Sequence, residues 1–366
     1  MGGDFQPVLI VPKEKRGPVL KRCSFGCLRG LHALNVTNGC SHYCVYCYAR
    51  GYSQAPPKGV VELYVNLPSL LVRELDNPRR RVRPQLVVFN TATDCFQPHP
   101  SIQKVTFRAM EALLQRGIPI SFLTKGEIGE EFFDLFKEKR GLIRTQIGLV
   151  SLSEGYWRRF EPGAASPERR LENIERLRRA GITAEVRIDP IIPFLTDGEE
   201  EMKALLKALR ELGVRRVTLN YLHLRPAIED NLRRELGSVW ERVLRVGYRN
   251  QPWRKVGTST RSKLLPRPLR QRGYERIVSF ARSLGIEAVI CSCKNPDLRG
   301  GLCIPPEWRA RYPQQLSLFS SSRGVQRQPN SSRIERTFSS PWGENSIRSS
   351  PSSGSISKET RGLRRS

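Results

Sequence analysis

The chain has 366 residues, and 62 Lys or Arg against 35 Asp or Glu give it a formal net charge of +27. A field of this sign attracts polyanions, so nucleic acid is the leading partner. An anionic membrane is the weaker alternative, because the sequence has no long apolar span. We therefore expect no membrane attachment. Hydrophobic residues make up 39% of the chain, enough for one large α/β barrel or two ordinary domains.

The first residues, MGGDFQPVLIVPKEKRGPV, do not resemble a secretory or transit signal. Acidic and proline residues interrupt their short apolar run. Gln6 stands where a myristoylation signal needs Ser or Thr. We therefore expect a cytoplasmic protein, in which nine clustered cysteines indicate metal binding rather than disulfides.

Residues 1–31 read as a basic, proline-containing leader, and an alternating pattern of strands and helices begins at His32. The predicted strands are residues 32–37, 85–90, 118–124, 145–153, 183–192 and 216–224, and the clearest predicted helices are residues 101–117, 166–181 and 197–213. Ser166 and Asp197 are predicted to begin the last two helices, which end at Gly181 and Gly213. Six such repeats predict an α/β fold with a partial (β/α)6 TIM-like barrel over residues 32–225.

A helical, cysteine-containing extension is predicted over residues 226–314. It holds a helical region (227–250), an arginine-rich run (254–272) that we do not expect to be a regular helix, and a helix–strand unit (274–293). From Ser320 the composition changes to Ser, Arg, Pro and Asn with few aliphatic residues. Such a segment buries too little surface to offset its ordering entropy, so residues 320–366 are predicted to be disordered.

The stretch NGCSHYCVYCYARGY places Cys40, Cys44 and Cys47 in CxxxCxxC spacing. Three thiols can hold three irons of a four-iron cluster and leave the fourth open to a small chelating molecule. The loop follows the first predicted strand, so the cluster would lie at the C-terminal mouth of the barrel. The alternative is a zinc site in which His42 or a distant residue completes the ligands.

The motif CxxxCx(aromatic)C after the first strand resembles the radical S-adenosylmethionine (SAM) superfamily. Together with "TATDCFQP", "LTK" and "PGAASPERRLENIERLRRAGI…RIDPIIPFLTD", it is similar to the spore photoproduct lyase-like branch, over residues 30–225. The resemblance implies a [4Fe-4S] cluster whose open iron binds the amino and carboxylate groups of S-adenosylmethionine. Reduction by an external electron donor then yields methionine and a 5′-deoxyadenosyl radical, which abstracts a hydrogen atom from the substrate.

The resemblance also assigns residues. Cys40, Cys44 and Cys47 are the expected cluster ligands, and Tyr46 and Tyr48 match two tyrosines implicated in hydrogen transfer in the lyase. The expected cofactor-binding positions are Thr91, Asp94, Lys125, Ser151 and Ser153. The alternatives are that the lysine is an ordinary solvated cation and that the tyrosines pack around the cluster.

One position departs from the lyase pattern. The lyase has a hydrogen-donating cysteine three residues before the aspartate of the "TATD" segment, and here that position is Thr91. Cys95, which follows Asp94, is either a displaced donor or a small buried residue behind the site. The lyase's own reversal of a thymine dimer therefore does not follow from the resemblance.

A second cysteine group lies outside the predicted barrel. Cys291, Cys293 and Cys303 follow it, and Cys23 and Cys27 precede it. Three thiols from one end and one from the other would complete a four-ligand site. An auxiliary iron–sulfur cluster is the first interpretation, zinc the second and unligated thiols the third.

The pentapeptide QLSLF resembles the motif by which bacterial DNA-processing proteins dock on the replication sliding clamp. Gln315, Leu316, Leu318 and Phe319 would make the contacts. The alternative is that these residues close the last hydrophobic contact of the folded body. Of the arginine-rich stretches, residues 254–272 are the best candidate for contacting a nucleic-acid backbone.

Three functions remain open from the sequence. The first is a radical enzyme, a lyase or a modifying enzyme, that repairs or modifies DNA and is recruited by the clamp. The second is a radical enzyme that modifies tRNA or protein, with the basic surface serving RNA. The third is a non-catalytic iron–sulfur or zinc protein that binds nucleic acid.

Overall fold

The computed structural model describes residues 8–80, 82–241, 245–256 and 261–310. These residues form an α/β fold whose main sheet has eight strands in the order β13-β10-β9-β8-β7-β6-β3-β2. All neighbouring strands run parallel except β2 and β3, which are antiparallel. The strands are β2 (Lys21–Arg22), β3 (His32–Leu34), β6 (Val87–Phe89), β7 (Ile120–Thr124), β8 (Ile143–Gly148), β9 (Ala184–Ile191), β10 (Arg216–Tyr221) and β13 (Glu287–Ile290).

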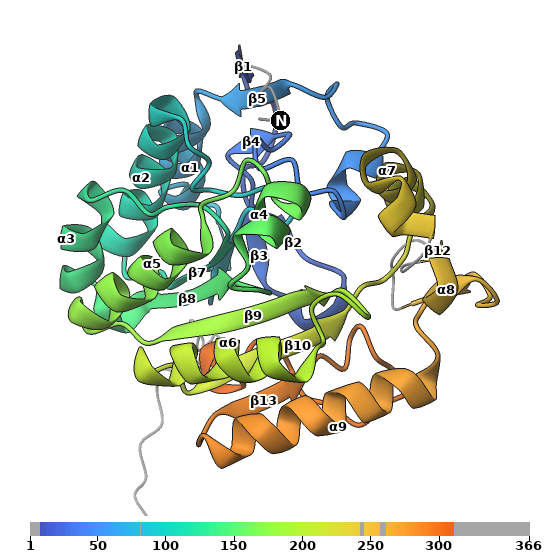
Figure 1. The fold of residues 1–366 in the computed structure, drawn as a ribbon. Coiled ribbons are helices and arrows are strands. Elements are labelled where there is room, and N and C mark those ends of the chain that lie inside the picture. The colour runs from blue at the N-terminus through green and yellow to red at the C-terminus, as the bar shows by residue number, and fades with distance from the viewer. Residues whose placement is uncertain (1–7, 81, 242–244, 257–260, 311–366) are drawn as a thin grey trace, which may run out of the picture. The chain divides into compact units, whose positions relative to one another are not determined.

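The six predicted repeats are confirmed as β3, β6, β7, β8, β9 and β10, in sequence order across the sheet. The sheet also extends past them, because β13 pairs with β10 and β2 pairs with β3. Helices cover the outer face of the partial barrel, with α6 and α9 lying across β9, β10 and β13 (Figure 1). The helices are α1 (Leu67–Leu75), α2 (Pro100–Gln115), α3 (Glu131–Glu138), α4 (Glu154–Phe160), α5 (Pro167–Arg179), α6 (Glu199–Glu211), α7 (Pro226–Leu236), α8 (Arg245–Tyr248), α9 (Arg267–Ser283) and α10 (Glu307–Ala310), with 3-10 turns η1 (Gly26–Leu28), η2 (Tyr48–Gly51) and η3 (Arg140–Leu142).

Helix α5 has both of its predicted ends. The Ser166 side chain accepts a hydrogen bond from the Arg169 amide, which caps the first turn, and Pro167 occupies the first helical position. Gly181, with φ of +75°, follows the last turn in the left-handed conformation that favours glycine. The apolar stripe of the helix packs Ile174 and Leu177 into the main core.

Two details of the sequence analysis are wrong. Helix α6 is capped by Gly198 rather than Asp197, whose carboxylate instead accepts hydrogen bonds from the Phe194 amide and the Tyr221 hydroxyl. The arginine-rich run 254–272 is partly helical, because Pro268 sits in the first turn of α9 where a proline is tolerated.

A smaller sheet of three strands lies beside the main one, in the order β1-β5-β4. Its strands are β1 (Leu9–Lys13), β4 (Thr37–Asn38) and β5 (Val60–Tyr64), and a two-stranded ribbon is formed by β11 (Arg254–Lys255) and β12 (Arg261–Ser262). Strand β1, which lies within the predicted leader, pairs in parallel with β5. No helix in the described ranges is long and apolar enough to cross a lipid bilayer.

Candidate active site

The cysteine loop lies between β4 and η2, beyond the C-terminal end of β3. Cys40, Cys44 and Cys47 are all partly exposed, and all three line one cavity of about 750 Å³. Burial, and then the neighbouring Glu161 carboxylate, raise the pKa of Cys44 to about 12. Burial also raises the pKa of Cys40, so Cys40 and Cys44 would need the positive charge of a bound metal to become thiolate ligands.

Glycines and backbone hydrogen bonds shape this loop. Gly39 has φ of +90°, and a Cβ there would lie 2.8 Å from the Val60 carbonyl oxygen. Gly163, on the loop after α4, donates from its amide to the His42 carbonyl, and a Cβ on Gly163 would lie 2.1 Å from the Ser41 carbonyl oxygen. The cysteine loop and the segment after α4 are therefore packed backbone against backbone.

A buried ion pair holds the same two segments together. Glu161 and Arg170 are each 1% exposed, and Arg170 Nη1 lies 2.5 Å from Glu161 Oε2. The Tyr46 hydroxyl, from the cysteine loop, donates to Glu161 Oε1. Burial alone would raise the pKa of Glu161, but the positive charges of Arg170 and Lys125 and the hydrogen bond from Tyr46 lower it below its ordinary value. Glu161 is thus an anion that fixes the position of Tyr46.

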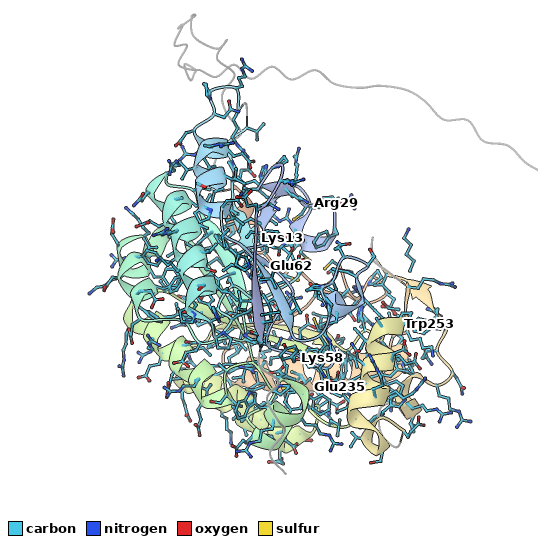
Figure 2. All side chains as sticks on the ribbon, turned by 90° about the horizontal axis from the view of Figure 1, so that it is seen from above. Lys13, Arg29, Lys58, Glu62, Glu235 and Trp253 are labelled. Atoms are coloured by element: carbon cyan, nitrogen blue, oxygen red, sulfur yellow. The ribbon has the colours of Figure 1, made fainter. Side chains whose placement is uncertain are left out.

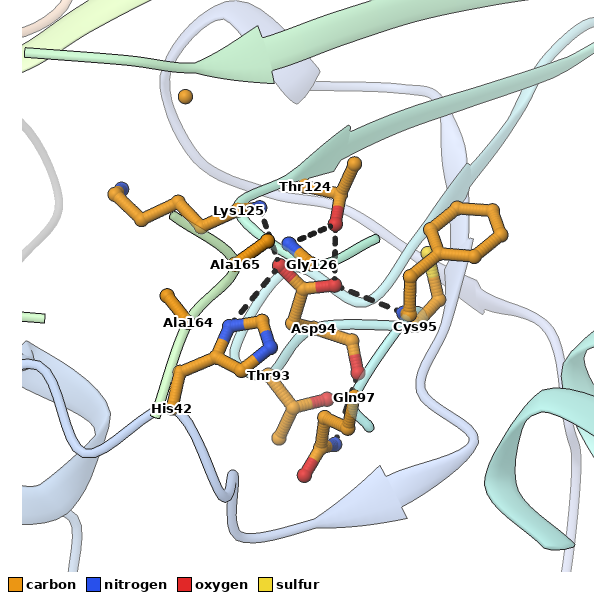
Figure 3. A network of polar contacts seen from close by, with 12 residues as sticks. His42, Thr93, Asp94, Cys95, Gln97, Thr124, Lys125, Gly126, Ala164 and Ala165 are labelled. Atoms are coloured by element: carbon orange, nitrogen blue, oxygen red, sulfur yellow. Dashed lines mark hydrogen bonds and ion pairs between the residues drawn. The ribbon is translucent and has the colours of Figure 1, made fainter. Parts of the chain in front are cut away.

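Asp94, in the loop that follows β6, is a hydrogen-bonding centre, as Figure 3 shows. Its Oδ1 accepts from the Phe96 amide at 2.8 Å and from the Thr124 hydroxyl at 2.7 Å, and its Oδ2 accepts from the Lys125 amide at 2.8 Å. His42 Nδ1 lies 3.5 Å from the same Oδ2. These contacts tie the ends of β6 and β7 to the cysteine loop, and Asp94 is not among the residues that line the cavity.

Lys125 directly follows β7, and its side chain reaches toward Tyr46 of the cysteine loop. Its Nζ lies 5.6 Å from the centre of the Tyr46 ring. Gly148, at the end of β8, leaves room for it, since a Cβ there would lie 2.9 Å from Lys125 Cγ. Ser151 and Ser153 take part in local turns: Ser151 Oγ accepts from the Ser153 amide, and Ser153 caps α4.

The remaining predicted residues divide between the cavity and the core. Thr91 lines the cavity, and its carbonyl accepts a hydrogen bond from the Tyr48 hydroxyl. Tyr48 is 37% exposed, whereas Tyr46 is 7% exposed and Cys95 is fully buried. Tyr46, Tyr48 and Cys95 are all absent from the lining of the cavity. The placement of Cys95 matches the interpretation of a small buried residue.

The lining of the cavity is strongly basic. Figure 2 shows Lys13 beside Glu62 and Lys58 beside Glu235. Among the described residues, Glu62 is the one acidic residue in the lining. The basic residues that line the cavity are Lys13, Lys15, Lys21, Arg22, Arg50, Lys58 and Arg234. Four of them, Lys15, Lys21, Arg22 and Arg234, form no ion pair with a carboxylate within the described ranges, which leaves uncompensated positive charge in the lining.

The second cysteine group is brought together as the sequence analysis expected. The sulfur atoms of Cys27, Cys291, Cys293 and Cys303 all lie within 4.8 Å of one another. Cys23 is the thiol left over, and it packs instead in a small apolar cluster with Leu31. The spacing of the cysteines alone did not show whether Cys23 or Cys27 would join the group.

Sequence reasoning missed Glu161 and Arg170, which hold the cysteine loop in place. Arg170 looks like one more arginine of an amphipathic helix, and its neighbours Arg169 and Arg176 are partly exposed. One signal was available: Arg170 falls on the same helical face as Ile174 and Leu177. The motif QLSLF (Gln315–Phe319) and the tail after it lie outside the described residues.

Comparisons with known proteins agree with this geometry. Residues 34–209 match the profile of the Radical SAM superfamily. An uncharacterised protein of Mycobacterium tuberculosis is 32% identical over 204 residues, which cover 53% of this chain and 59% of that protein, less than two thirds of its length. A Pseudomonas phage M6 protein named radical SAM Nalpha-GlyT isomerase is 22% identical over 260 residues, covering 69% of this chain and 51% of that protein.

Among solved structures, a cysteine-to-serine mutant of spore photoproduct lyase matches with a TM-score of 0.58 and 16% identity. The match covers 76% of this chain and 81% of that one. Another structure of the same lyase contains bound AdoMet and a dinucleoside spore photoproduct. At this level of identity the likeness shows the fold alone.

Proposed function

Because the chain belongs to the radical SAM superfamily, we propose that it is a radical enzyme that acts on DNA, repairing or modifying it. One observation carries the choice of a nucleic-acid substrate, and the clamp-like motif of the sequence favours DNA over RNA. The cavity lined by Cys40, Cys44 and Cys47 is also lined by seven basic side chains and, among the described residues, one acidic side chain. A polyanion bound along that lining would reach the thiols.

The residues present fit the cofactors that the superfamily implies. The three thiols share one cavity, and its volume of about 750 Å³ lies in the range of small-molecule sites. Their sulfurs do not form a compact set around a single ion, because the one group of ligand atoms in the described ranges within 4.8 Å of one another is the second cysteine group. When bound there, a [4Fe-4S] cluster and S-adenosylmethionine supply one electron and a carbon-centred radical that removes hydrogen from a substrate.

The chain's own residues position and enclose that site. Glu161 and Arg170 hold Tyr46 and the cysteine loop, while Asp94 holds the ends of β6 and β7. Of the two tyrosines, we assign hydrogen transfer to Tyr48, because it is 37% exposed and its hydroxyl donates to the carbonyl of Thr91, a residue that lines the cavity. We assign a structural role to Tyr46, which is buried and bonded to Glu161. Lys125 remains the proposed cation near the cofactor, with Ser151 and Ser153 shaping the turn beside it.

Two exposed aromatic side chains support a nucleic-acid substrate. Phe25 is 44% exposed and Tyr52 is 39% exposed, and both line the cavity among the basic residues. Aromatic rings at the surface of a basic groove stack with unpaired bases, and arginines and lysines beside them contact phosphates. A single-stranded or extruded nucleotide is therefore the form of DNA that we propose to enter.

The remaining partners are proposed from the sequence. An external electron donor is needed to reduce the cluster, and Leu316 and Phe319 are proposed to dock on the bacterial sliding clamp. In that case, the Leu316→Ala/Phe319→Ala variant loses clamp binding in a pull-down while Ser317→Ala keeps it. The cytoplasm stays the proposed location, because nine free thiols suit a reducing compartment.

Binding measurements test the basic lining. Lys21 and Arg22 are exposed and line the cavity, so the Lys21→Glu/Arg22→Glu variant should bind single-stranded DNA more weakly. The slope of log affinity against log salt should fall by about 1 for each phosphate contact removed. The matched control is Arg282→Glu, an exposed arginine in the last turn of α9 that should change neither quantity. Equal losses in both variants would contradict the proposed binding face.

Isotope transfer tests the reaction itself. The reconstituted enzyme is supplied with S-adenosylmethionine and with deuterated DNA or deuterated RNA, and deuterium is measured in the 5′-deoxyadenosine that forms. The proposal predicts enrichment from DNA. Enrichment from RNA alone would favour the tRNA-modifying alternative, and no enrichment from either would point to a protein substrate.

A further inference from the structure

Four cysteines from the two ends of the described chain meet in a compact group. Cys27 belongs to η1, whereas Cys291, Cys293 and Cys303 follow β13, and Cys27 and Cys303 are 276 positions apart. The Cys291 sulfur lies 3.0 Å from that of Cys293 and 2.8 Å from that of Cys303. All four are free thiols, and three of them are buried.

We propose that Cys27, Cys291, Cys293 and Cys303 bind one zinc ion. A tetrahedral zinc with four thiolates has zinc–sulfur bonds of about 2.3 Å, which set the sulfurs about 3.8 Å apart. The observed sulfur spacings, from 2.8 Å to at most 4.8 Å, bracket that value. In a four-iron cluster each thiolate binds a different iron, so the sulfurs are held farther apart than around a single ion.

The surroundings suit a thiolate site. The Cys303 amide lies 3.4 Å from the Cys27 sulfur and donates to it, and such contacts stabilise negative charge on the sulfur. Gly26, at φ of +49°, leaves room for the site, since a Cβ there would lie 3.1 Å from the Cys293 sulfur. Arg144 donates to the Cys303 carbonyl at 2.6 Å, and its guanidinium is held in place by an ion pair with Glu185.

The zinc would join the two edges of the main sheet. Strands β2 and β13 are the first and last in the sheet order, and the described residues contain no hydrogen-bonded pairing between them. Cys27 lies on the turn between β2 and β3, and Cys291 directly follows β13. A single ion bound to both segments would close the partial barrel where backbone pairing does not. This role is structural and does not depend on the proposed DNA substrate.

Metal analysis of the full chain tests the proposal. Protein reconstituted with iron and sulfide should contain about one zinc and about four irons per chain. Cys303→Ser should lose the zinc and keep the iron, while the matched control Cys23→Ser, in the same N-terminal segment but outside the group, should keep both. Zinc retained in Cys303→Ser, or about eight irons per chain with no zinc, would overturn the assignment.

A second measurement needs no variant, in case Cys303→Ser does not fold. X-ray absorption at the zinc edge of the wild-type protein should show four sulfur neighbours at about 2.3 Å and no nitrogen or oxygen neighbour. A mixed shell containing nitrogen or oxygen, or protein purified without zinc, would refute the site. Because neither readout uses S-adenosylmethionine or DNA, failure here is distinct from failure of the proposed function.

Discussion

Removing Arg170 should test how the cysteine loop is held in place. Arg170 is 1% exposed, its Nε donates to the Ala165 carbonyl at 2.8 Å, and its Nη1 donates to the Gly148 carbonyl at 2.9 Å while contacting Glu161. Arg170→Met keeps much of the side-chain volume but leaves the Glu161 carboxylate buried without its cation. Breaking a buried pair in this way costs about 3 to 5 kcal/mol.

Arg169 provides a matched control one position away. Its side chain is 56% exposed and pairs with Glu172, which is 50% exposed, at 2.8 Å. A surface pair of this kind contributes about 0.5 kcal/mol or less, so Arg169→Met should scarcely change stability. The free energy of unfolding is measured for both variants by urea titration, from the midpoint and the slope.

The double variant makes the test sharper. Glu161→Gln removes the negative charge that Arg170→Met leaves unpaired, so the double variant should be less destabilised than the sum of the two single variants. Strict additivity, or a loss below about 1 kcal/mol in Arg170→Met, would refute the view that this pair is a buried and coupled unit.

Other positions give further predictions. Burial, with the nearby Lys294 charge next, lowers the pKa of His223 to about 3 from its ordinary 6.5. Between pH 3 and pH 6.5 the His223 side chain is therefore protonated in the unfolded chain and neutral in the folded chain. The free energy of unfolding should fall by about 1 kcal/mol per pH unit as the pH drops below 6.5. In urea titrations from pH 7 to 5, His223→Gln should show a smaller loss, and an unchanged loss would contradict the assignment. Gly148→Ala should displace Lys125 and weaken S-adenosylmethionine binding severalfold by calorimetry, and unchanged affinity would count against a role for that lysine. Gly163→Ala should lower the iron retained per chain, while Gly141→Ala, with open space at its Cβ, serves as the control for both.

The periodicity of the sequence was sufficient to predict the six strand–helix repeats of the partial barrel. Strand and helix patterns alternate regularly from His32, and short-range signals such as Ser166 and Gly181 mark helix ends without tertiary information. The cysteine spacing also placed Cys40, Cys44 and Cys47 on one loop at the mouth of the sheet.

The long-range contacts that fix the cysteine loop could not be predicted from sequence periodicity or spacing. The pairing of Tyr46 with Glu161 joins positions 115 apart, and nothing local distinguishes that carboxylate from a surface one. Likewise, Cys23 and Cys27 differ only in how the turn after β2 directs their side chains. Asp197 shows the converse, since a good helix-capping residue is used instead to bind the Tyr221 hydroxyl.

The most direct test of the proposed chemistry is the formation of 5′-deoxyadenosine from S-adenosylmethionine under strong reduction. The reconstituted wild-type protein should form it, and Cys44→Ala should form none above background while keeping the wild-type unfolding midpoint in urea as evidence of folding. A wild-type protein that never cleaves the cofactor, or a Cys44→Ala variant that still does, would contradict the assignment of this loop as the site of radical generation.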